Sequence, residues 1–170
     1  EVVEARQVQL LADMDFYLSS LPEAECMLSV RGVGAVTVAG LLGECGNIGK
    51  FKNYEQLEKF VGLNLYEVSS GKHKGKKRIS KRGRALARYL ICHIALMQCK
   101  SSGLYEDLAK QMKASGKKTG EIRVALARKL LRVLYAIARD CRPFEPQRFF
   151  TGARTEDGPV IQQEAQPEAA

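Results

Sequence analysis

No uninterrupted apolar run in the sequence approaches the roughly 20 residues that a membrane-spanning helix needs, and the amino terminus shows no signal-peptide pattern. From both absences we expect a soluble, intracellular protein without a membrane partner. The five cysteines are an odd number and include no Cys-x-x-Cys pair, so the sequence favours neither a disulfide framework nor a zinc site. We interpret them as buried thiols.

Histidines are scarce as well, since His73 and His93 are the only two and neither stands at ligand spacing from a cysteine. His73 lies among lysines, where it could act as a base or simply contact a phosphate. His93 lies on an apolar stretch, so we expect it in the core. Four acids are expected on helix surfaces: Glu55, Glu58, Glu106 and Asp107. Nothing marks a pair of them for general acid and base catalysis.

Positive charge is abundant, and the 170 residues carry a formal net charge of +8. This excess indicates an acidic partner, and nucleic acid is the commonest one for a basic protein; an anionic membrane is the alternative. The length suits one compact domain with a helical arm and a tail. The chain starts in a helical pattern without a preceding Met, so we expect it to be part of a longer protein.

Apolar periodicity predicts a mainly α fold in which several helices surround one core. Helices are predicted at residues 2–20, within 28–46, and at 53–60, 80–99, 104–114 and 121–139. The side chains predicted to face the core are Leu86, Leu90, Ile94 and Met97 in one helix, and Ile122, Leu126, Leu130, Val133 and Ile137 in the last. Residues 63–79 are predicted to form a basic loop or short hairpin.

Three parts of the chain are distinguished by these patterns. Residues 1–22 read as a helical arm with a narrow, coiled-coil-like apolar face. Residues 23–150 form the main domain. Residues 151–170 have no apolar face, and we expect a disordered tail there.

A glycine turn at Gly32-Val33-Gly34 separates two apolar pieces. It resembles a helix-hairpin-helix, in which glycine amides and the start of the next helix bind a nucleic-acid phosphate. An ordinary turn that uses glycine for its dihedral angles is the other interpretation. The nearby Lys50 and Lys52 favour phosphate.

Nine basic residues follow one another between positions 72 and 88 without an acid among them: Lys72, Lys74, Lys76, Lys77, Arg78, Lys81, Arg82, Arg84 and Arg88. We predict that Ser80 caps a helix whose first two turns hold several of these charges. Positive charge at a helix amino terminus opposes the helix dipole, so a bound anion would explain it. A nucleic-acid phosphate site is favoured over a flexible solvated run.

Ser69 and Ser70 precede Gly71 at the head of this basic run. A serine becomes a nucleophile only when a base, a metal or a positive cluster lowers the cost of ionising it, and a phosphate flanked by arginines is a suitable electrophile. A Ser-Ser-Gly sequence is also a common turn. The residues alone leave both interpretations open.

The order of motifs from Leu28 to Phe150 resembles the carboxy-terminal transposase domain of the insertion-sequence 110 family. The motifs are the Gly-Val-Gly turn with a small-residue helix, Phe51 with a helix containing Leu57, Gly62-Leu63, SSG at residues 69–71, and RISKRGRALARYL at residues 78–90. The resemblance implies a DNA recombinase of a mobile element, in the bacterial cytoplasm near the nucleoid, with double-stranded DNA and a structured guide (bridge) RNA as partners.

The resemblance also implies a composite active site. A separate RuvC-like domain would supply acidic residues that hold Mg²⁺, and this chain would bind no cofactor. Ser70 would be the nucleophile, with Ser69 as the fallback, and Arg78, Lys81 or Arg82 would stabilise charge on the attacked phosphate. The first helix would belong to a coiled-coil arm, and the full-length protein would be a dimer or tetramer. The alternatives are a non-catalytic helix-hairpin-helix module and a structural RNA-binding protein.

Overall fold

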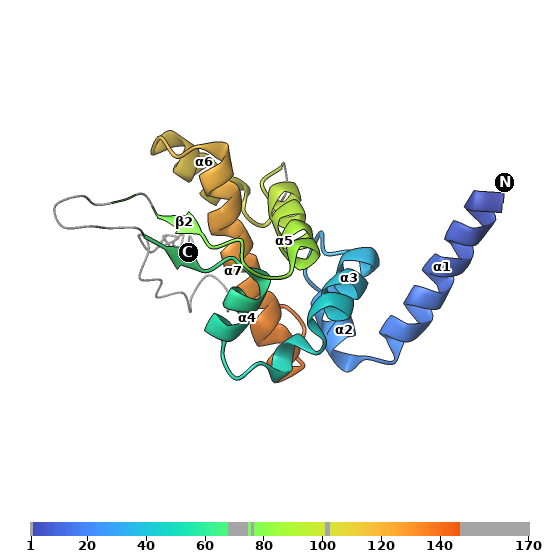
Figure 1. Ribbon diagram of the computed structural model, residues 1–170. Coiled ribbons are helices and arrows are strands. Elements are labelled where there is room, and N and C mark those ends of the chain that lie inside the picture. The colour runs from blue at the N-terminus through green and yellow to red at the C-terminus, as the bar shows by residue number, and fades with distance from the viewer. Residues whose placement is uncertain (1, 68–74, 76, 101–102, 147–170) are drawn as a thin grey trace, which may run out of the picture.

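The computed structural model describes residues 2–67, 75, 77–100 and 103–146 (Figure 1). Within them the chain forms α1 (Val2–Ser19), α2 (Pro22–Leu28), α3 (Ala35–Cys45), the 3-10 turn η1 (Ile48–Lys50), α4 (Tyr54–Val61), β1 (Leu65–Tyr66), β2 (Arg78–Ile79), α5 (Ala85–Gln98), α6 (Glu106–Ala114) and α7 (Thr119–Asp140). The prediction of a mainly α fold is confirmed. The predicted tail, 151–170, lies outside the described residues. No helix in the described ranges is long and apolar enough to cross a membrane.

Helix α7 forms the centre of the bundle and contacts α2, α4, α5, α6 and η1 (Figure 1). All five side chains predicted to face the core from this helix are buried, which confirms its apolar face. The neighbours also bind it through polar groups. The Tyr135 hydroxyl donates to the Phe51 carbonyl at 3.0 Å. A Cβ added to Gly49 in η1 would lie 2.6 Å from the Ala138 carbonyl oxygen, so the two backbones touch.

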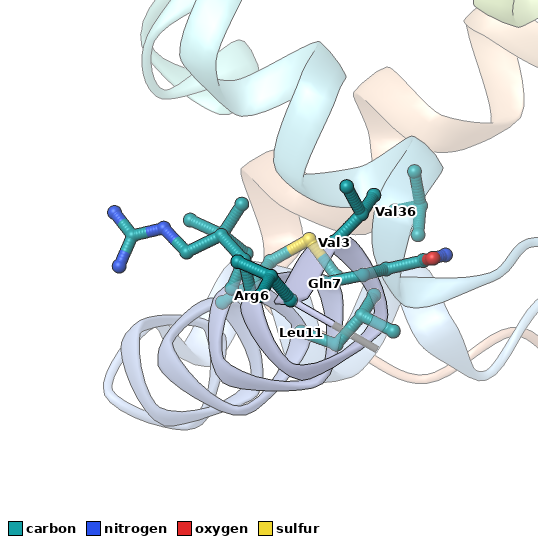
Figure 2. Close-up of a pocket in the computed structure, with 8 residues that line it drawn as sticks. Val3, Arg6, Gln7, Leu11 and Val36 are labelled. Carbon is teal, nitrogen blue, oxygen red and sulfur yellow. The ribbon is translucent and has the colours of Figure 1, made fainter.

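Helix α1 projects from the bundle and is mostly exposed, as expected for an arm (Figure 1). Leu18 is its one buried residue within the described chain. The predicted apolar face is exposed at Val3, Leu10 and Leu11, which line an open groove beside Val36 of α3 (Figure 2). Its other two residues, Met14 and Leu18, are partly buried and buried against the bundle. Pairing of this face with another helix stays a prediction.

The predicted boundaries of α4 are confirmed by its caps. The Asn53 side chain accepts a hydrogen bond from the Gln56 amide at 2.9 Å, and the Gln56 side chain accepts one from the Lys52 amide at 3.1 Å. Gly62 ends the helix in the left-handed conformation, at φ 78°.

The prediction that Ser80 starts the next helix is wrong, because α5 begins at Ala85. Its inward face was predicted only in part: Ile94 is buried as expected and Leu90 is partly buried, but the other two residues are not. Leu86 is 50% exposed and Met97 38% exposed, whereas Ala87 and Ile91 are fully buried. The buried stripe is thus displaced by one residue, about 100° around the helix. Packing of α5 between α3 and α7 decides which face is buried.

Three further expectations need correction. His93 is exposed, and its ring stacks on Tyr89 with centroids 5.9 Å apart, so it is not a core residue. Glu58 is buried rather than on the surface, because it pairs with Arg128 across the α4–α7 contact. The cysteines are free, but four are only half-buried and Cys141 is exposed.

The face of α5 can be tested with two alanine substitutions. Ile91→Ala should lower the free energy of unfolding by about 2–5 kcal/mol, because it leaves a cavity between α5 and its neighbours. Leu86→Ala removes a half-exposed side chain and should change it by less than about 1 kcal/mol. Urea unfolding monitored by circular dichroism measures both. An equal loss in the two variants would contradict the face described above.

Candidate nucleic-acid interface

The described part of the basic run includes β2, one strand of a two-stranded hairpin. β1 and β2 pair antiparallel, with Leu65 opposite Ile79 and Tyr66 opposite Arg78. The sequence predicted a loop or a short hairpin here, and the paired strands show a hairpin. Ser69, Ser70, Lys72, His73, Lys74 and Lys76 lie outside the described residues, between the two strands in the sequence.

The pairing continues beyond β2 along the end of α4. The Ser80 amide donates to the Asn64 carbonyl at 2.9 Å, the Lys81 amide to the Gly62 carbonyl at 3.1 Å, and the Arg84 amide to the Phe60 carbonyl at 2.9 Å. We call residues 78–84 the cationic segment. These hydrogen bonds fix its backbone, and they are the reason that Ser80 does not cap α5. These seven residues are therefore not a flexible, solvated run, which was the alternative interpretation of the sequence.

Two glycines allow this close contact between backbones. A Cβ on Gly83 would lie 2.3 Å from the Phe60 carbonyl oxygen, and one on Gly62 would lie 2.9 Å from the Arg82 carbonyl oxygen. Both glycines have positive φ, 151° and 78°. Any larger residue would push the cationic segment away from α4.

Arg88 holds the same contact from the first turn of α5. Its Nη1 donates to the Val61 carbonyl at 3.0 Å and to the Lys81 carbonyl at 3.2 Å. Lys81 is left-handed at φ 56°, a conformation that costs a non-glycine residue about 1–2 kcal/mol. Its backbone N–H and C=O are both hydrogen-bonded, which offsets this strain. Arg88, predicted to bind nucleic acid, thus orients the cationic segment.

The basic side chains of the cationic segment point into solvent. Arg78, Lys81, Arg82 and Arg84 are exposed, as is Lys77 just before it. The Arg84 guanidinium lies 5.6 Å from the centroid of the Phe60 ring. No ion pair joins any of these five to an acid within the described ranges. The positive charges are therefore uncompensated and stand on a backbone that is held in place, which suits binding to a phosphate backbone.

The helix-dipole argument for an anion is weakened by the true start of α5. Lys81 and Arg82 precede this helix instead of occupying its first two turns, and only Arg84 and Arg88 lie at its amino end. The case for an anion therefore rests on the uncompensated charge of the cationic segment.

The glycine turn lies elsewhere in the fold. Gly32 has φ 79°, and a Cβ there would lie 2.7 Å from Gln98 Nε2 at the end of α5. Gln98 is buried; its amide nitrogen donates to the Arg31 carbonyl, and its amide oxygen accepts from the Leu104 amide at 2.8 Å. Packing against Gln98 thus accounts for Gly32. Gly34 precedes α3 and supplies no side-chain cap, so the first amides of that helix are open.

The turn and the cationic segment lie at opposite ends of α5. Gln98 ends this helix and Arg84 precedes it, so about 20 Å separates the two places at 1.5 Å per residue. Lys50 and Lys52 follow α3, at the end away from Gly34, and do not support a phosphate site at the turn as the sequence suggested. The structure therefore separates the predicted binding residues into two places.

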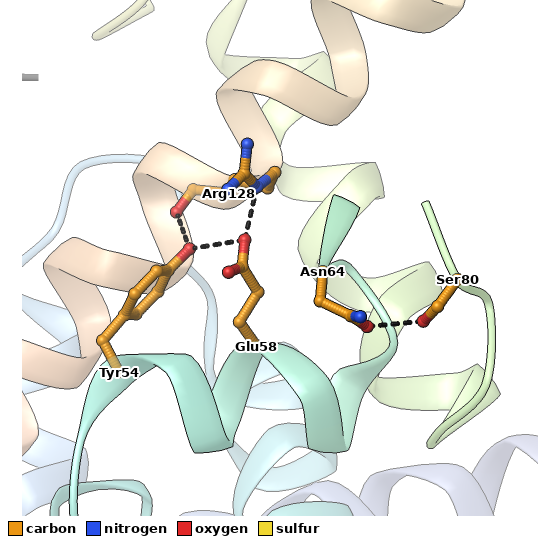
Figure 3. Close-up of polar contacts among 5 residues, drawn as sticks. All are labelled: Tyr54, Glu58, Asn64, Ser80 and Arg128. Carbon is orange, nitrogen blue, oxygen red and sulfur yellow. Dashed lines mark hydrogen bonds and ion pairs between the residues drawn. The ribbon is translucent and has the colours of Figure 1, made fainter. Parts of the chain in front are cut away.

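A buried polar network fixes the end of α4 to α7 (Figure 3). Glu58 Oε1 accepts from Arg128 Nε, and the Tyr54 hydroxyl donates to the Arg128 carbonyl at 2.9 Å. Burial, followed by the charge of Glu58, raises the pKa of the Tyr54 hydroxyl, so it stays a donor at neutral pH. Helix α4, whose end contacts the cationic segment, is therefore held to the core.

Other chemistry is poorly supported in the described part of the chain. No group of three His, Cys, Asp or Glu side chains there could hold a metal ion. Burial raises the pKa of Cys45 to about 11, so this cysteine is a neutral thiol and a weak nucleophile at pH 7.

Comparison with known proteins assigns this part of the chain to a family. Residues 24–107, from within α2 to the start of α6, match the Transposase IS116/IS110/IS902 family. The chain contains a transposase domain of this family. The matched residues include every position predicted for catalysis or nucleic-acid binding.

Individual relatives agree with this assignment. The pilin gene-inverting protein of Moraxella bovis is 27% identical over 124 residues, 72% of this chain and 38% of that protein. A probable family 20 transposase of Pseudomonas aeruginosa is 24% identical over 140 residues, 81% of this chain and 41% of that protein. An uncharacterized 42 kDa protein of insertion element IS900 from Mycobacterium paratuberculosis is 32% identical over 127 residues, 72% of this chain and 31% of that protein. The transposase domain thus lies in a chain that spans well under half of each relative.

The contact between the cationic segment and α4 can be tested at two left-handed glycines. Gly116 has φ 80° and an open Cβ position, so Gly116→Ala should lower the free energy of unfolding by only the backbone cost, about 1–2 kcal/mol. Gly62→Ala has the same backbone cost and adds a clash with Arg82 and Arg88. It should therefore lower the free energy of unfolding by about 1–3 kcal/mol more than Gly116→Ala does. Urea unfolding gives both values. Equal losses would mean that the cationic segment does not press on α4.

Proposed function

We propose that this domain binds double-stranded DNA and the structured guide (bridge) RNA of an insertion sequence, and that it supplies a serine nucleophile for DNA strand cleavage and exchange. The observation that carries the proposal is the uncompensated cationic segment on its hydrogen-bonded backbone, which follows the Ser69-Ser70-Gly71 motif in the sequence. The first relative, named for inverting a pilin gene, supports a recombination reaction.

In this mechanism the Ser70 oxygen attacks a backbone phosphorus. A serine–phosphate ester forms while the bond from phosphorus to one deoxyribose oxygen breaks, and that oxygen leaves as a hydroxyl once protonated. A deoxyribose hydroxyl of the exchanged strand then attacks the same phosphorus and releases the serine. Arg78, Lys81 or Arg82 would stabilise the negative charge that builds up on the phosphate oxygens. Ser69 is the fallback nucleophile.

The resemblance to the insertion-sequence 110 family implies Mg²⁺ at the active site. We assign it to acidic residues of a separate RuvC-like domain, where it would polarise the attacked phosphate. The present chain would then bind nucleic acid and complete the active site. Exchange between two duplexes requires two such sites, which fits a dimer or tetramer of the full-length protein.

A non-catalytic helix-hairpin-helix module is the second candidate. The open amides at the start of α3, beside Gly34, favour it, since they could bind a phosphate without help from the cationic segment. It differs from the first proposal in having no use for Ser70.

Trapping the covalent intermediate distinguishes the two candidates. Full-length protein is incubated with radiolabelled substrate DNA and run on a denaturing gel, and the wild type should give a protein–DNA adduct. Ser70→Ala should abolish the adduct because it removes the attacking oxygen, whereas Ser69→Ala should retain it. Loss of the adduct in Ser69→Ala alone would move the nucleophile to Ser69. Absence of any serine-dependent adduct would favour the binding module.

A further inference from the structure

A pocket of about 450 Å³ opens beside the base of the hairpin. Its lining comes from the end of α4, from β1 and from the cationic segment: Lys59, Asn64, Tyr66, Ser80 and Arg82. Of these, only Arg82 was predicted to bind nucleic acid. The size lies within the range of about 300–1,000 Å³ that is typical of small-ligand sites.

One side of the pocket offers hydrogen-bond donors and positive charge. Asn64 Oδ1 accepts a hydrogen bond from the Ser80 hydroxyl (Figure 3), which leaves the amide N–H groups of Asn64 available. Neither Lys59 nor Arg82 is ion-paired with an acid in the part of the chain that the structure describes. Two cations and a neutral donor around one space form a good site for a phosphate group.

The other side of the pocket carries an aromatic ring. Tyr66 is 45% exposed, and no ring within the described residues stacks on it. Tyr89 differs, because it is exposed but already stacks on His93. The backbone of Tyr66 is fixed by its place opposite Arg78 in the hairpin. Its ring therefore stands on a paired backbone, lines the pocket and is open to a nucleic-acid base that could stack on it.

We propose that this pocket holds one unpaired DNA nucleotide, with its base on Tyr66 and its phosphate on Lys59, Asn64 and Arg82. The proposal rests on the proposed function, since strand exchange requires that nucleotides at the cut leave their duplex. A base inside a duplex has both faces covered by its neighbours, so only an unstacked base can use the Tyr66 ring. The pocket would thereby retain the opened strand beside the cationic segment.

Binding measurements with full-length protein test the stacking partner. Fluorescence anisotropy is recorded with a labelled single-stranded DNA oligonucleotide and with the matching duplex. Tyr66→Leu should weaken single-strand binding about 5- to 150-fold, which corresponds to the stacking free energy of one base. It should change duplex binding less than about twofold. Tyr66→Phe keeps the ring and should bind like the wild type. Tyr89→Leu, a change at an exposed tyrosine outside the pocket, should also bind like the wild type.

A scan with abasic sites locates the nucleotide. One abasic position should weaken wild-type binding as strongly as Tyr66→Leu does, and the two changes together should cause no further loss. Equal loss for single strand and duplex, no loss at all, or additivity at every position would overturn the proposal. Loss confined to an RNA oligonucleotide of the same sequence would assign the pocket to RNA and overturn it too. These outcomes are independent of the adduct result with Ser70→Ala, so the two proposals can fail separately.

Discussion

The contact between the backbone of the cationic segment and the end of α4 determines where the positive charge of this domain lies. Gly62 and Gly83 permit the approach, and Arg88 donates to carbonyls on both sides of it. A run of like charges repels itself and would otherwise remain an extended, mobile chain. Here main-chain hydrogen bonds fix the backbone, while the charged side chains stay in solvent. A pre-ordered segment loses less conformational entropy when it binds, so more of its charge interaction appears as affinity.

That contact depends in turn on the core. Helix α4 is attached to Arg128 of α7 through Tyr54 in its first turn and Glu58 in its last, and α7 packs against most of the other elements. The centre of the bundle therefore holds α4 in place, and α4 in turn holds the base of the hairpin. The arm formed by α1 projects from the bundle and is mostly exposed (Figure 1). The cationic segment and the exposed arm are thus separate parts of the structure.

Local signals predicted the elements whose structure is decided locally. The Asn53 cap, the Gly62 stop and the apolar face of α7 were all predictable, because each depends on residues within a few turns. The Ser80 cap was a wrong prediction, because tertiary hydrogen bonds to Asn64 and Gly62 compete for residues 80 and 81. The one-residue error in the face of α5 has the same origin, since both sides of that helix carry apolar residues and only packing against α3 and α7 chooses between them. Lys59, Asn64 and Tyr66 had no motif to reveal them, because they meet Arg82 only through the hairpin register and the hydrogen bonds between the cationic segment and the end of α4.

We propose that the hairpin base, and not the glycine turn at the far end of α5, is the principal DNA-binding face. The most direct measurement is photocross-linking of full-length protein to substrate DNA that carries 5-iodouracil near the cut, followed by mass spectrometry of the linked peptides. We expect cross-links to concentrate on residues 59–66 and 77–84, with Tyr66 prominent among them. Cross-links confined to the turn around Gly32 and Gly34, with none at the hairpin base, would contradict it.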